Sequence, residues 1–327
     1  MENKLYTYDQ VVAMIKQGFT LALAGDEKIV SKLPAGNWIG GTIPYFMDVD
    51  SCKFSQDMIF VNKIETYNNE YKIKVYDENS ILNIVKDSFD NGYTLLIIPP
   101  FQKIHEEYAI QSEFLEGLYN NPIIGWIAGT DLNSSDTPKV FCGMTNKVYT
   151  DKAVAFHVKL PENKFAQIDI VNIFEPDQNH DEIKFYNNTF EVTNCMINGS
   201  DVNFAEYISE NNIDNKLPLI ADYSGASINV SIKEVDIENK KVSFFAPVFK
   251  SKTYKFPRQI PDYISKFDEG TNNLSENNSF SCNCILNYLY GELEGKKINN
   301  INGPITFGEI GYQLLNQTLV TLTVDEI

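Results

Sequence analysis

A short pattern in which an apolar strand runs into glycine and then threonine occurs twice in this chain. Its copies are Trp38-Ile39-Gly40-Gly41-Thr42 and Trp126-Ile127-Ala128-Gly129-Thr130, which contain the only two tryptophans. A looser copy, Ile305-Thr306-Phe307-Gly308-Glu309-Ile310, lies near the end. Glycine lets a backbone approach another segment or a ligand closely, because it carries no side chain. The recurrence predicts duplicated units arranged around a common feature.

The first part of the chain has the order strand, helix, strand. Tyr93–Ile98 is a continuous apolar run, which is typical of a strand covered on both faces. A helix is expected from about Ile104 to Tyr119, and it leads directly into the second glycine pattern. This order predicts an α/β layer with some parallel pairing, and we expect a first domain over residues 1–150.

The middle of the chain changes to alternating apolar and polar residues. Examples are Val154–Val158 and Gln167–Val171, and Glu238–Lys241 resembles a hairpin turn. These features predict a second, β-rich domain over residues 151–327. We therefore predict a fold between α/β and α+β, with mixed β-sheets, flanking helices and two pseudo-repeated subdomains.

The charge of the chain limits its partners. Among 327 residues, 44 Asp and Glu outnumber 27 Lys and Arg, which gives a formal net charge of −17. Such a surface repels nucleic-acid phosphates and anionic lipids, so we predict neither nucleic-acid nor membrane partners. The N-terminus does not resemble a signal peptide, and the five cysteines are an odd number. We therefore predict reduced thiols and a cytoplasmic location.

Common catalytic motifs are missing from the sequence. The chain has no phosphate-binding loop, dinucleotide fingerprint, nucleophile elbow or His-Glu-x-x-His motif. We therefore predict no catalytic residues, no metal site and no cofactor.

The densest cluster of reactive side chains is Ser281-Cys282-Asn283-Cys284. On a strand, Cys282 and Cys284 would share a face, where they could bind a metal with outside ligands, act as nucleophiles, or pack as small apolar side chains. One alternative function is therefore a thiol-dependent enzyme that uses Cys282 or Cys284, with His157 or His105 as the base.

The tail resembles a known family. The segments Phe280-Ser281-Cys282, Gly303–Ile310 and Asn316–Val320 are similar to the C-terminal region of FIST domains. The resemblance implies an N-terminal FIST-like domain over 1–150, a C-terminal one over 151–327, and a sensory module. Such a module binds small ligands, amino acids among them, and acts on a signalling partner protein. The chain departs from the family at Asn283 and Cys284, where an arginine commonly follows the Ser-Cys pair.

These observations favour a cytosolic protein that binds a small molecule, with amino acids or related metabolites as expected ligands. Paired aromatic side chains and a carboxylate suit an amine. The predicted pocket is lined by Trp38, Gly40, Gly41, Thr42, Trp126, Thr130, Cys282, Thr306 and Glu309. In the alternative interpretation the tryptophans only anchor two related cores. A third hypothesis is an acidic interaction or assembly protein, including a homodimer through edge strands.

Overall fold

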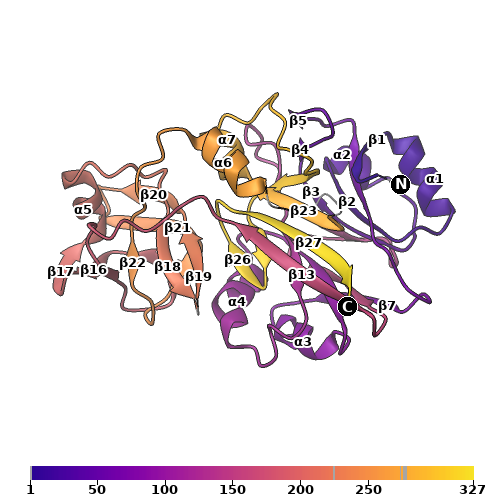
Figure 1. The fold of residues 1–327 in the computed structure, drawn as a ribbon, viewed down its shortest axis with the longest axis horizontal. Helices are drawn as coiled ribbons and strands as arrows, with labels where there is room; N and C mark the ends of the chain where they lie inside the picture. The colour runs from indigo at the N-terminus through magenta and orange to yellow at the C-terminus, as the bar shows by residue number, and fades with distance from the viewer. Residues whose placement is uncertain (1, 224, 273, 275–277) are drawn as a thin grey trace. The chain divides into compact units, whose positions relative to one another are not determined.

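The computed structural model describes residues 2–223, 225–272, 274 and 278–327. The predicted mixed α/β class is confirmed, because helices flank several mixed sheets, none of which is closed within the described residues (Figure 1). The chain forms two compact units. The first comprises Met1–Val171, Thr271–Leu314 and Leu319–Ile327, and the second comprises Asn172–Gly270 and Leu315–Thr318.

The first unit is built from three sheets of six strands each. The first sheet has the order β1 (Lys4–Tyr6), β6 (Ile59–Lys63), β2 (Leu21–Gly25), β3 (Trp38–Thr42), β10 (Val140–Cys142), β11 (Lys147–Tyr149). The second has β7 (Tyr71–Tyr76), β12 (Ala153–Lys159), β8 (Gly92–Ile98), β9 (Ile123–Ile127), β25 (Glu309–Gly311), β26 (Gln313–Leu315). The third has β13 (Lys164–Val171), β27 (Leu319–Glu326), β23 (Phe280–Cys284), β24 (Gly303–Thr306), β4 (Tyr45–Met47), β5 (Cys52–Phe54).

Short helices precede or connect these strands. They are α1 (Tyr8–Lys16), α2 (Glu27–Val30), η1 (Ile81–Asn83), α3 (Ile84–Asp87), α4 (Lys103–Gln111), η2 (Ser112–Phe114) and α7 (Ile285–Tyr290). None of the helices in the described ranges is long and apolar enough to cross a membrane.

The three sheets share one plan, so the described residues contain the same repeat three times. Each repeat holds a parallel strand pair joined through a helix: β2–α2–β3, β8–α4–β9 and β23–α7–β24. The last strand of each repeat, β6, β12 or β27, returns antiparallel to the first strand of its pair. An edge strand, β1, β7 or β13, then pairs with that returning strand.

Each repeat gives a two-stranded hairpin to a neighbouring sheet. The hairpin β4–β5 of the first repeat pairs with β24 of the third, and β10–β11 of the second repeat pairs with β3 of the first. The pair β25–β26 of the third repeat extends the second sheet at β9. This cyclic exchange interlocks the three repeats, so none of the three six-stranded sheets comes from one repeat alone.

Strand pairing fixes how the repeats align. Gly25 pairs with Thr42, Ile98 with Ile127 and Cys284 with Thr306, each at the end of a parallel pair. In this register Trp38 corresponds to Ile123, and Trp126 corresponds to Gly41. Repeated units are therefore present, but the recurring tryptophan motif does not mark equivalent positions.

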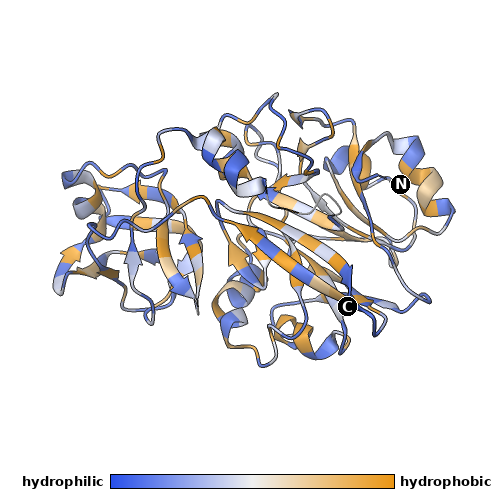
Figure 2. Ribbon diagram, viewed as in Figure 1, coloured by the Kyte–Doolittle hydropathy of each residue, from blue (hydrophilic) through white to orange (hydrophobic). Residues whose placement is uncertain are grey.

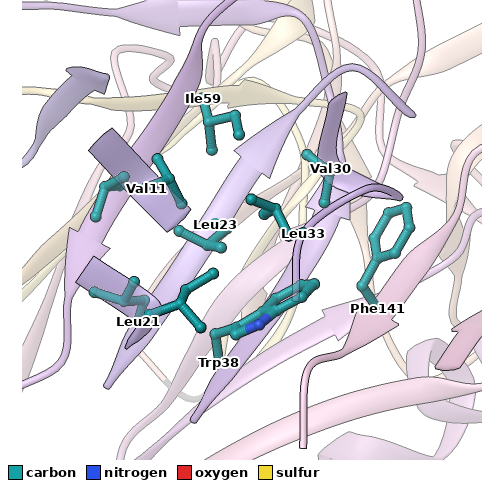
Figure 3. Close-up of a cluster of buried hydrophobic side chains, with 10 residues drawn as sticks. Val11, Leu21, Leu23, Val30, Leu33, Trp38, Ile59 and Phe141 are labelled. Atoms are coloured by element: carbon teal, nitrogen blue, oxygen red, sulfur yellow. The ribbon is translucent and has the colours of Figure 1, made fainter. Parts of the chain in front are cut away.

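The first repeat encloses a hydrophobic cluster around Trp38, shown in Figure 3 with Val11, Leu21, Leu23 and Phe141. Helix α1 faces this cluster because Thr7 and Gln10 form a capping box, which fixes the start of the helix and turns Val11 and Ile15 inward. Hydrophobic residues concentrate on the strands, whereas loops are mostly hydrophilic (Figure 2).

The second unit is rich in strands and, apart from Leu315–Thr318, lies between β13 and β23 in the sequence. Its larger sheet has the order β17 (Ser200–Asn203), β16 (Asn194–Ile197), β14 (Ile183–Lys184), β22 (Tyr254–Lys255), β18 (Leu219–Tyr223), β19 (Ala226–Val230). Its smaller sheet has β15 (Thr189–Val192), β21 (Lys241–Val248), β20 (Ile232–Asp236), and its helices are α5 (Phe204–Glu210) and most of α6 (Tyr263–Thr271). Buried aromatic rings, among them Phe185, Phe204 and Phe244, form its core.

The equivalent glycines Gly40 and Gly125 give a matched test of the repeat. A Cβ atom at Gly125 would lie 1.8 Å from the Leu96 carbonyl oxygen, whereas one at Gly40 would lie 3.0 Å from the corresponding oxygen of Leu23. We expect Gly125→Ala to lower the free energy of unfolding by roughly 3 kcal/mol or more and Gly40→Ala by roughly 1 kcal/mol, because both contacts are with backbone oxygens but only the one at Gly125 is far too short for a Cβ atom. Urea denaturation measures the free energy of unfolding of both variants. Equal losses would contradict the closer approach of Leu96 to Gly125.

Candidate functional site

A pocket of about 280 Å³ lies in the first unit, where β2 and β3 end. In α/β proteins, ligands bind preferentially beyond the carboxyl ends of parallel strands, because loops and helix starts meet there. The pocket is lined by Asp26, Glu27, Lys28, Ser31, Lys32, Thr42, Ile43, Pro44, Gly129, Thr130, Asp131 and Asp136. The location and the polar lining make it the candidate functional site.

One wall of the pocket is formed by a loop that breaks the threefold plan. Two residues, Ile43–Pro44, join β3 to its hairpin, and Phe307–Gly308 do the same after β24. The corresponding connection after β9 spans residues 128–139, from which Gly129, Thr130, Asp131 and Asp136 line the pocket. The pocket therefore occurs where the second repeat differs most from the other two.

Thr42 ties both ends of this loop to β3. Its carbonyl oxygen accepts the Gly129 N–H at 2.7 Å, and its own N–H donates to the Lys139 oxygen at 2.9 Å. Its Oγ1 accepts the Lys139 N–H at 2.9 Å. The loop therefore begins and ends at fixed points, because one buried residue holds both of its ends.

Tyr45 holds the first half of the loop at Asp131 and Leu132. Its hydroxyl lies 3.4 Å from Asp131 Oδ1 as a donor and accepts the Leu132 N–H at 3.2 Å. The ring packs between Phe54 and Tyr288, with centroid distances of 5.2 and 5.4 Å. Burial raises the pKa of Tyr45, so the hydroxyl keeps the proton that it donates to Asp131.

Charged side chains of both signs line the pocket. Asp26 caps α2, because its Oδ1 accepts the Lys28 N–H at 2.8 Å. Glu27 forms an ion pair with Lys139, so these two charges compensate each other. Within the described part of the chain, no group of three or more His, Cys, Asp or Glu side chains could hold a metal ion.

The structure separates the residues predicted to line one pocket. Thr42 and Thr130 line the observed pocket. Trp38 lies instead in the hydrophobic cluster, where its Nε1 donates to the Pro34 oxygen at 2.9 Å and Gly40 shares its face of β3. Gly41 points to the other face, where an added Cβ would lie 2.9 Å from Trp126 Nε1. The two tryptophans therefore lie on opposite sides of β3.

The other predicted residues are buried inside the first unit, apart from the pocket lining. Trp126 stacks on Phe280 with ring centroids 5.6 Å apart. Cys282 Sγ lies 3.2 Å from the Gly125 oxygen, and Thr306 and Glu309 are each 0% exposed. The sequence interpretation missed Asp131, Asp136 and the side chains of α2. The polar run from Asn133 to Thr137 was the available signal for this loop, but nothing in it names a ligand.

The environment of Cys282 favours its protonated thiol. Cys282 and Cys284 are 0% and 1% exposed, and burial raises the pKa of Cys282, with the nearby Glu309 carboxylate adding to the effect. The candidate bases are also buried, and burial lowers the pKa of His105 to about 4.

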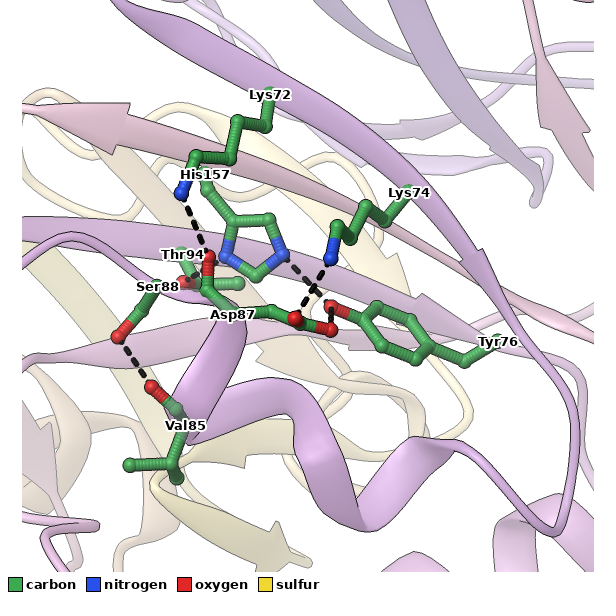
Figure 4. Close-up of polar contacts among 8 residues, drawn as sticks. All are labelled: Lys72, Lys74, Tyr76, Val85, Asp87, Ser88, Thr94 and His157. Carbon is green, nitrogen blue, oxygen red and sulfur yellow. Dashed lines mark hydrogen bonds and ion pairs between the residues drawn. The ribbon is translucent and has the colours of Figure 1, made fainter.

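His157, on β12, belongs to a hydrogen-bonded network that joins the second sheet to α3 (Figure 4). Its Nδ1 lies 2.8 Å from Thr94 Oγ1, and its Nε2 lies 2.9 Å from the Tyr76 hydroxyl. That hydroxyl donates to Asp87 Oδ2 at 3.0 Å, and Lys74 pairs with the other Asp87 oxygen at 2.6 Å. The network fastens the end of α3 to β7, β8 and β12.

We expect His157 to make the stability of the protein depend on pH. Burial lowers the pKa of His157 to about 4 from a usual value of 6.5, with Asp87 opposing this effect and Lys72 and Lys74 adding to it. Between these values the unfolded chain binds a proton that the folded chain excludes. The contribution of neutral His157 to the free energy of unfolding is therefore present above pH 6.5 and is lost as the pH falls towards 4.

A His157→Gln variant retains hydrogen-bonding atoms but does not titrate. Between about pH 7 and about pH 4, the free energy of unfolding should fall by roughly 3 kcal/mol less in this variant than in the native protein. Urea denaturation at both pH values measures the difference, and His105 is common to both proteins. Identical pH dependence would show that His157 ionises freely in the folded state.

Comparisons with known proteins place the chain in a family. The model of DUF6976, a family of unknown function, matches residues 6–325. No curated protein and no solved structure matches the chain. The expected membership of the FIST family is therefore wrong. Local contacts account for two residues of the FIST-like tail: a Cβ at Gly303 would lie 2.1 Å from the Ser281 oxygen, and Cys282 Sγ donates to the Gly125 oxygen at 3.2 Å. The chain belongs to the DUF6976 family.

Proposed function

We propose that the protein binds a small polar metabolite in the pocket at the ends of β2 and β3. The observation that carries this proposal is the loop over residues 128–139. It replaces a two-residue connection in the other repeats, and it supplies a wall of the pocket. Thr42 holds the loop at both ends and Tyr45 holds it at Asp131 and Leu132, so the binding of a ligand requires little further ordering of these segments.

The lining supports binding rather than nucleophilic catalysis. The described lining residues include no histidine or cysteine, and the hydroxyls are those of Ser31, Thr42 and Thr130. The Thr42 hydroxyl already bonds the backbone of Lys139. We place this function in the cytosol, because all five cysteines are buried thiols.

A substitution that fills the pocket with a large side chain tests the proposal. Ser31 is exposed and lines the pocket, so Ser31→Trp fills the pocket without disturbing the core. Ala13 is exposed on α1 and does not line the pocket, so Ala13→Trp is the matched control. The probes are the twenty amino acids, putrescine, spermidine, the nucleobases and short carboxylic acids, each at millimolar concentration in a thermal-shift assay.

At least one probe should raise the melting temperature of the native protein and of Ala13→Trp by a few degrees, and Ser31→Trp should lose that shift. No shift with any probe, or an unchanged shift in Ser31→Trp, would contradict the proposal.

A further inference from the structure

We infer that the ligand of this pocket is a zwitterion, with an ammonium group at one end and a carboxylate at the other. This inference rests on the proposed binding function. It follows from the distribution of charge over two walls of the pocket. The helix wall comprises Lys28, Ser31 and Lys32, and the loop wall comprises Thr130, Asp131 and Asp136.

The helix wall is basic at the positions that face the pocket. Lys28, Ser31 and Lys32 are spaced three and four residues apart, so they share one side of α2 and the turn that follows it. Both lysines are exposed, and no ion pair of either is found within the described residues. Of the acidic residues on this side of the pocket, Glu27 is paired with Lys139, whereas Asp26 caps α2 and keeps its charge beside Lys28. The two lysines therefore outnumber the carboxylate of Asp26, and this excess positive charge can meet a carboxylate of the ligand.

The loop wall is acidic. Asp131 is oriented by Tyr45 and by the Asn133 N–H, which donates to the same Oδ1 at 2.9 Å. Asp136 is exposed, and no lysine or arginine occurs between Ala128 and Pro138. This wall can therefore meet an ammonium group with carboxylates held on an anchored loop.

A ligand with a single charge would satisfy one wall and oppose the other. A cation would lie near Lys28 and Lys32, and an anion would lie near Asp131 and Asp136. A small molecule with both charges complements both walls at once. The pocket of about 280 Å³ has room for a molecule of amino-acid size.

Thiol labelling with charged reagents can measure the difference in charge between the helix wall and the loop wall before the ligand is known. All five native cysteines are buried, so a single introduced thiol dominates the reaction. We would compare Thr130→Cys on the loop wall, Ser31→Cys on the helix wall and Ala13→Cys on exposed α1. Each variant is labelled with two methanethiosulfonate reagents, one carrying a cationic trimethylammonium-ethyl group and the other an anionic sulfonatoethyl group. The ratio of the two labelling rates is then divided by the ratio measured for Ala13→Cys.

We expect the normalised ratio to favour the cationic reagent by at least about threefold for Thr130→Cys and the anionic reagent by a similar factor for Ser31→Cys. Adding Asp136→Lys to Thr130→Cys, or Lys28→Glu to Ser31→Cys, should remove each preference.

Two negative results would have different meanings. The same charge preference at both walls would overturn the zwitterion inference and leave the proposed binding function standing. Labelling of Thr130→Cys no faster than that of the native buried thiols would show that the loop wall borders no accessible pocket. That result would overturn both proposals.

Discussion

The first unit depends on close backbone contacts that only glycine permits. An added Cβ at Gly125 or Gly303 would lie about 2 Å or less from a carbonyl oxygen of the neighbouring strand, the former 1.8 Å from Leu96 and the latter 2.1 Å from Ser281. An added Cβ at Gly129 would meet Phe307 at 2.5 Å and Ile43 at 2.7 Å. These contacts let segments from all three repeats pack against one another. Trp38, Trp126 and Glu309 are buried in this dense packing, whereas the pocket lies where a loop departs from the plan.

The sequence predicted the layers of the fold better than their connections. The continuous apolar run Tyr93–Ile98 predicted a strand covered on both faces, and β8 is one, because every residue from Gly92 to Ile98 is buried. The hairpin exchange could not be predicted, because the link Ile43–Pro44 carries no information about which strand β4 will meet. The return of β23, β24 and β27 to the unit that contains β1 depends on contacts between residues far apart in the chain.

The candidate site was predicted only in part, for a geometric reason. The glycine–threonine pattern identified Thr42 and Thr130, since Thr42 ends β3, Thr130 follows the end of β9, and both line the pocket. The same pattern suggested that Trp38 and Trp126 converge, but side chains alternate along β3, so Trp38 and Gly41 face opposite sides. Asp131 and Asp136 were missed because a carboxylate in a polar loop resembles any solvated residue until its anchor, here Tyr45, is known.

The central claim is that the repeats make the core and the loop makes the pocket. Deleting residues 131–137 joins Thr130 to Pro138 and shortens the connection to five residues, while Gly129 and Lys139, which contact Thr42, remain. The most direct measurement is calorimetric unfolding of this variant with and without the probe that stabilises the native protein. The variant should unfold as the native protein does, near the native melting temperature, and should show no effect of the probe. A variant that fails to fold, or one that still responds to the probe, would contradict this claim.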